Sequence, residues 1–81
     1  MKRYIAFYNE GIDRESDKYI DSDYIPVGAI VRYQTNDATT GVFWYVITAV
    51  PGHNGEVYGH VAMGINEADV PPWVRGYLLI L

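Results

Sequence analysis

The chain has 81 residues, ten acidic against six basic, a net charge of −4 and no cysteine. This length predicts one domain over residues 1–81, and the missing cysteine excludes disulfides and thiolate zinc sites. The basic residues are scattered, so we do not expect nonspecific nucleic-acid binding. A hydrophobic content of 49% is high for so small a domain, and we expect a homo-oligomer that covers the surplus apolar surface.

Membrane insertion and export are not expected. The longest apolar run is half the length needed to cross a bilayer. The apolar stretch 5–8 behind Lys2 and Arg3 is too short for the core of a signal peptide. Together with the absence of cysteine, these observations predict a cytoplasmic protein without membrane contact.

The first elements differ sharply in character. Residues 3–9 predict a strand that is apolar on both faces, which is typical of a strand covered on both sides or paired at an interface. Residues 10–23 carry six acidic side chains and no periodic apolar pattern. We expect a long, mostly exposed acidic loop there, with at most a short turn of helix or a small hairpin in it; the loop is either a solvated connection or a recognition loop.

Two strands are predicted next. Residues 24–35 form the second, with Pro26 breaking its entry and a polar turn cluster over 36–40 ending it. Residues 41–50 are the longest uninterrupted apolar run, rich in β-branched and aromatic side chains, and predict the central strand.

The dipeptide Asn54-Gly55 is the strongest hairpin signal in the chain. A two-residue turn there places Thr48 opposite Val61, on the more strictly apolar face, which we expect to meet the core. A longer turn would shift the register by one and exchange the faces. The opposite face sets large residues against small ones and predicts cover by a further layer, a ligand or a partner: Tyr45 against Gly64, Ile47 against Ala62, and Ala49 against His60.

The C-terminal part begins with a predicted helical turn over 67–69, capped by Asn66. Residues 73–81 predict a last strand, which pairs beside the first strand, closes a barrel or lies in a subunit interface. The fold class that follows is all-β, a small five-stranded antiparallel barrel or half-open barrel with one long acidic loop after the first strand.

Four segments carry a resemblance at the level of fold. They are an aromatic opening strand (4–8), a glycine-initiated second strand (27–31), an aromatic start of the third (43–45) and prolines before the terminal strand (71–73). Their order resembles that of SH3-like barrels over most of the chain. Ala29 stands where that family usually has an acidic residue, and Tyr77 lies far from Pro72, so the resemblance implies the fold and not a groove for proline-rich peptides.

Catalytic chemistry has little support. His53 and His60 are the only imidazoles, and with Glu56 they would make at best a weak, exposed metal site. Ser16 and Ser22 lie in the acidic loop, where nothing would activate them as nucleophiles. The carboxylates of that loop lack the apolar pocket that acid catalysis needs. We expect no enzyme, no cofactor and no metal.

The eight tyrosines and two tryptophans are the most informative compositional excess. Their polar tips and large apolar bodies suit interfaces, although aromatic residues also fill a barrel and its rim. We expect some of them to form a partner- or ligand-binding surface with arginines as cationic complements. The candidate residues are Tyr8, Arg32, Tyr33, Tyr45, Tyr58, His60, Trp73 and Arg75.

Three functional hypotheses remain. The first is a non-enzymatic binding protein that acts by contact through an aromatic-rich surface, as a small viral inhibitor of a host defence protein does; this rests on size and charge alone. The alternative is an oligomer that sequesters a nucleotide-like small molecule by aromatic stacking and arginine contacts. The second alternative is a structural subunit of a larger assembly.

Overall fold

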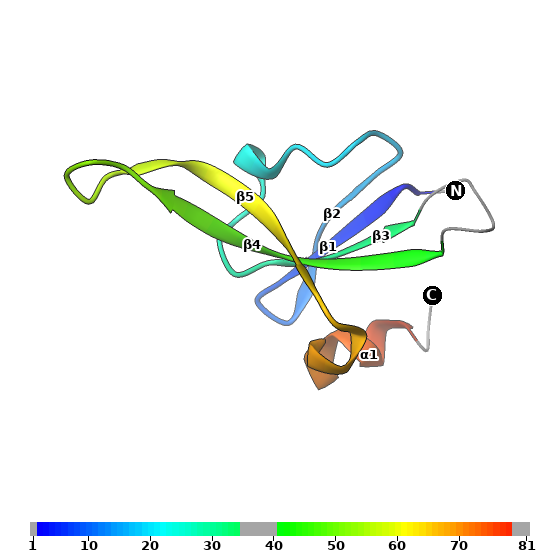
Figure 1. The fold of residues 1–81 in the computed structure, drawn as a ribbon. Helices are drawn as coiled ribbons and strands as arrows, with labels where there is room; N and C mark the ends of the chain where they lie inside the picture. The colour runs from blue at the N-terminus through cyan, green and yellow to red at the C-terminus, as the bar shows by residue number, and fades with distance from the viewer. Residues whose placement is uncertain (1, 35–40, 79–81) are drawn as a thin grey trace.

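The computed structural model describes residues 2–34 and 41–78. Five strands form one antiparallel sheet in the order β2-β1-β3-β4-β5 (Figure 1). The prediction of five antiparallel strands is therefore confirmed. Among the described residues, the edge strands β2 and β5 do not pair with each other, so the prediction of a closed barrel is wrong. The elements are β1 (Tyr4–Tyr8), β2 (Gly11–Ser16), the 3-10 turn η1 (Ser22–Tyr24), β3 (Ile30–Gln34), β4 (Val42–Pro51), β5 (Val57–Ile65), the 3-10 turn η2 (Glu67–Asp69) and the helix α1 (Pro72–Leu78).

The strand β1 is buried on both faces, as its sequence predicts. Tyr4 and Ala6 point into one cluster of buried residues, and Ile5 and Phe7 point into another on the opposite side. The alternation of side chains along a strand produces this division. Because both faces are apolar, the sheet needs a covering layer on each side.

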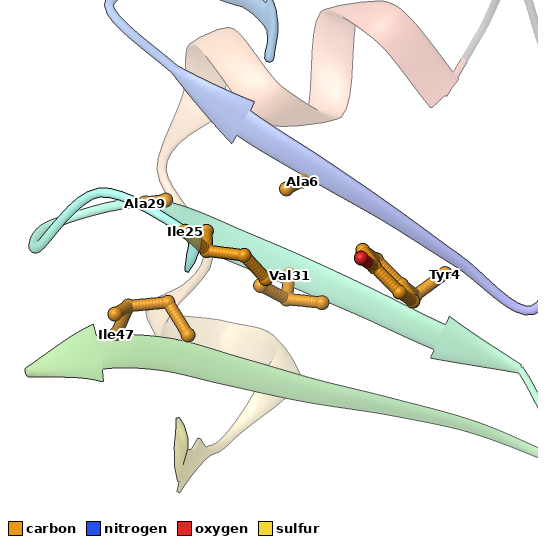
Figure 2. Packing of buried hydrophobic residues seen from close by; sticks show 6 residues of the cluster. All are labelled: Tyr4, Ala6, Ile25, Ala29, Val31 and Ile47. Carbon is orange, nitrogen blue, oxygen red and sulfur yellow. The ribbon is translucent and has the colours of Figure 1, made fainter. Parts of the chain in front are cut away.

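The segment 17–29 covers the first face. Its Ile25 is fully buried and lies with Val31 and Ile47 against β3 and β4 (Figure 2). Ile20 of the same segment packs on the edge of this cluster. The predicted second strand, 24–35, is therefore shorter than expected: residues 24–29 belong to the covering segment, and the polar cluster at 36–40 lies outside the described residues.

Helix α1 covers the second face, on the other side of the sheet from segment 17–29 (Figure 1). Val74 is fully buried against Phe7, and Trp73 meets the Phe7 ring edge-on with centroids 6.4 Å apart. The predicted last strand over 73–81 is thus wrong for its described part. Pro72 begins the helix, a position that proline favours, and Trp73, Val74, Tyr77 and Leu78 share one helical face.

The long acidic loop is not confirmed. Residues 11–16 form β2, in the small hairpin that was one of the alternatives for this stretch, and the 3-10 turn η1 begins at Ser22. This strand pairs with β1 through a two-residue connection, Asn9–Glu10. Both residues have positive φ, 52° and 60°, which is the signature of a type I′ hairpin turn. With a hairpin after the first strand and a helix at the end, the SH3-like order of features is not confirmed.

The β4–β5 hairpin has the predicted register, with Thr48 opposite Val61 and Ile47 opposite Ala62. Its turn is longer than the two residues expected. The Gly52 amide donates to the carbonyl of Glu56 at 2.6 Å, and this hydrogen bond closes a turn over residues 53–55. A register shift next to Pro51 compensates for the longer turn. The faces are therefore the predicted ones.

The two faces of this hairpin are covered unequally. The face with Ile47 and Ala62 meets segment 17–29, so the predicted further layer is supplied by the chain itself. The more apolar face meets α1 only at its Trp44 and Ile65 end. Beyond that point the hairpin extends away from the body as an arm (Figure 1).

We predict that Glu10→Gly stabilises the protein by about 1 kcal/mol, because glycine adopts a positive φ without the steric cost that glutamate bears. The backbone carbonyl of Glu10, which accepts a hydrogen bond from the Tyr77 hydroxyl at 2.7 Å, is kept. Urea denaturation would measure the change. The control is Glu15→Gly in the same hairpin, which relieves no positive φ and should destabilise; equal effects would contradict the explanation.

Candidate functional site

The junction between η1 and β5 is held by three hydrogen bonds to a single residue. The Ser22 hydroxyl donates to the His60 carbonyl at 2.8 Å, and the His60 amide donates to Asp23 Oδ1 at 3.1 Å. The His60 Nδ1 lies 2.7 Å from the carbonyl of Ile25 and, because a carbonyl only accepts, carries the hydrogen. This residue therefore anchors the covering segment to the sheet.

Gly59 allows this close approach. A Cβ at that position would lie 2.9 Å from Asp23 Oδ1, closer than carbon and oxygen tolerate. The missing side chain lets the carboxylate reach the His60 amide. Segment 17–29 is thus fixed against β5 by the hydrogen bonds to His60 and by the space that Gly59 leaves for Asp23.

Two exposed tyrosines flank this junction. Tyr24 follows Asp23 and is 70% exposed, and Tyr58 precedes Gly59 and is 75% exposed. We call Tyr24 and Tyr58 the tyrosine surface. Its surroundings are acidic, since Asp21 and Asp23 border Tyr24 along the chain.

A third exposed tyrosine lies nearer the start of the same segment. Tyr19 is 75% exposed, and the guanidinium of Arg3 lies 4.6 Å from the centre of its ring. Arg3 also donates to the Tyr33 hydroxyl at 3.4 Å, and this hydrogen bond raises the pKa of Arg3. The cation is thus held between one exposed and one half-buried tyrosine.

The other predicted aromatic residues support the core. Tyr8, Tyr33 and Tyr45 pack against the cluster under segment 17–29, and the last two meet edge-to-face at 6.4 Å. Trp73 packs on Phe7 from α1, on the opposite side of the sheet. The structure therefore divides the predicted aromatic surface between two faces and leaves Tyr58 as its exposed member.

The two predicted arginines make contacts within the chain. Arg75 donates to the backbone carbonyls of Val70 and Glu67, which ties α1 to η2. Arg32 lies on the α1 face beside Trp44 and donates to Gln34 Oε1 at 3.3 Å. They do not converge on one place with the exposed tyrosines.

An open hollow of about 280 Å³ lies where β4 begins and β5 ends. Its lining includes Phe43, Trp44, Tyr45 and Glu67, and no basic side chain among the described residues. The volume is at the lower end of what small-molecule sites have. A lining with one acidic and no basic side chain is poorly suited to a phosphate.

Within residues 2–34 and 41–78, no group of three or more histidine and acidic side chains is arranged to hold a metal ion. Within the same residues no helix is long and apolar enough to cross a membrane.

Sequence reasoning missed Tyr19 and Tyr24. Tyr19 lies in the predicted acidic loop 10–23, and Tyr24 is the first residue of the predicted second strand 24–35. The signal that would have found them is the apolar residue that follows each tyrosine: Ile20 packs against the core, Ile25 is fully buried in it, and each holds the neighbouring tyrosine at the surface.

Comparisons with known proteins do not restrict the function. No family model matches the chain, and neither a curated protein nor a solved structure is similar to it. The function must therefore be inferred from the geometry of the chain's own residues.

We predict that His60→Ala lowers the free energy of unfolding by about 1 kcal/mol, because the Ile25 carbonyl loses its donor in a half-buried place. Chemical denaturation monitored by tryptophan fluorescence would measure this. His53→Ala is the matched control: His53 is exposed in the hairpin turn, and its replacement should change stability by less than about 0.5 kcal/mol. Equal losses would show that the His60 contact contributes nothing.

Proposed function

We propose that this protein is a non-enzymatic binding protein that covers a site on a larger protein through its tyrosine surface and thereby inhibits it. The supporting observation is that Tyr24 and Tyr58 stay exposed beside a backbone held by Ser22, Asp23 and His60. Small viral inhibitors of host defence proteins act in this manner, and the small size and acidic charge of the chain support that comparison. The absence of cysteine supports action in the cytoplasm.

The physical argument concerns the cost of binding. A tyrosine supplies a large, rigid and amphipathic contact area with few torsions to immobilise. Since the backbone around Tyr24 is already fixed by hydrogen bonds, little further ordering is needed on association. The neighbouring Asp21 and Asp23 favour a partner with a basic surface.

The alternative functions receive less support. A nucleotide-like ligand needs a cation near a stacking platform. Arg75 instead binds backbone carbonyls, and the lining of the hollow beside Trp44 contains Glu67 and, among the described residues, no basic side chain. A structural subunit that pairs its terminal strand with neighbours is not supported, because residues 72–78 form α1.

We predict that affinity capture from a lysate of the cells in which the protein is made retains one specific partner. Tyr24→Ala with Tyr58→Ala should weaken this complex at least tenfold, since central tyrosines often contribute more than about 1 kcal/mol each. Titration of the purified partner would measure the change. Raised salt should also weaken binding if the partner surface is basic.

The matched control is Tyr24→Phe with Tyr58→Phe, which keeps both rings and should retain most of the affinity. Because both side chains are exposed, neither double variant should lose its fold, and circular dichroism would verify this. A partner captured equally well by the alanine variant would contradict the proposed surface.

A further inference from the structure

The outer edge of β5 carries backbone groups that point away from the sheet. The His60 amide and carbonyl bond to Asp23 and Ser22 and therefore face outward from β4. In an antiparallel pair this direction repeats every second residue, so the groups of Ala62 and Gly64 also face outward. Ile47 confirms this phase, because it exchanges hydrogen bonds with Gly28 and Ala29 on its other side and not with Ala62.

The backbone groups of Ala62 and Gly64 form a short unpaired part of this edge, which we call the free window. On one side it ends at His60, whose groups are occupied by the covering segment. On the other side it ends at Asn66, whose carbonyl accepts from the Asp69 amide in η2. Between them, the amides and carbonyls of Ala62 and Gly64 have no hydrogen-bond partner among the described residues.

The two edges of the sheet differ in their protection against pairing. The opposite edge, β2, carries Asp13, Arg14 and Glu15, the kind of charged side chains that discourage another strand from adding to an edge. From Val57 to Ile65, β5 contains no Asp, Glu, Lys, Arg or Pro. Pairing of two copies along Val57–Ile65 therefore sets no charged side chains of this strand against each other.

We propose that two copies of this chain join through β5 in an antiparallel, two-fold symmetric pair with Met63 on the axis. Ala62 of each copy then lies opposite Gly64 of the other, and the amides and carbonyls of both residues are all satisfied. The two sheets become one continuous sheet. The partner of this edge is a second copy because the free window is complementary to itself.

The neighbouring registers satisfy fewer of these groups. Moving the axis to Ala62 places Gly64 opposite His60, whose groups are already bonded. Moving it to Gly64 places Ala62 opposite Asn66, whose carbonyl is occupied by η2. Only the axis at Met63 pairs all the groups of the free window. The register is therefore determined by the contacts that end this window, at His60 and at Asn66.

The apolar face of the arm supports the same arrangement. Met63 is 54% and Val61 is 41% exposed, and the pairing places Val61 opposite Ile65 of the second copy.

The first test is light scattering after size exclusion over a range of concentrations. We expect a mass that rises to twice 9.2 kDa. Gly64→Pro removes an outward amide without touching the ladder to β4 and should raise the dimer dissociation constant at least tenfold. Gly64→Ala is the matched control, because nothing lies within 4 Å of the added Cβ and the amide remains; it should dimerise like the wild type.

A second test does not depend on proline being tolerated. The chain has no cysteine, so Met63→Cys can only form a disulfide with another copy, and facing residues in a non-hydrogen-bonded pair lie about 4.5 Å apart at Cα, within disulfide range. We expect rapid cross-linking by oxidised glutathione for Met63→Cys and little for Val61→Cys. The reverse order would overturn the register.

A monomer at every concentration would overturn the proposal altogether and leave the edge to a strand of another protein. The proposed inhibitory function would be unaffected, because it depends on Tyr24 and Tyr58 and is tested by capture of a partner. Conversely, a dimer without any captured partner would support the pairing and contradict the inhibitory role.

Discussion

The central constraint on this structure is that the inner strands are apolar on both faces. Phe7 needs cover on one side of β1 and Ala6 on the other, and a chain of 81 residues has little material with which to supply it. One short helix, α1, covers one face, and the irregular segment 17–29 covers the other. The parts of the sheet that remain exposed are those that neither α1 nor segment 17–29 covers.

Segment 17–29 connects core and surface. Ile25 closes the core beneath it, while Asp23 and Ser22 bind the outer edge of β5 at His60. The same contacts leave Tyr24 in solvent on a fixed backbone. Segment 17–29 is held in place by hydrogen bonds to the edge of β5. These bonds have two consequences: they fix the backbone that carries Tyr24, and they limit the part of the edge that can accept another strand.

The arm formed by β4 and β5 shows the other consequence. Its apolar face continues past the end of α1, so Val61 and Met63 remain 41% and 54% exposed. Charge on β2 protects one edge of the sheet, and β5 has no such protection. The proposed self-pairing at β5 and the proposed partner binding at Tyr24 and Tyr58 depend on different groups of the chain.

Local patterns in the sequence were sufficient to predict β1, β4 and β5 and the register of the β4–β5 hairpin. The reason is that the alternation of side chains and the turn residues act over only a few positions. The strand β2 and the helix α1 were decided by the tertiary structure. Residues 11–16 lack an apolar pattern and become a strand only because β1 offers them an edge. Residues 73–78 are apolar enough for a strand, but the uncovered face around Phe7 requires a helix that presents Trp73 and Val74 together. The tyrosine surface depends on the same long-range contacts, since the hydrogen bonds to His60 join residues that are far apart in the chain.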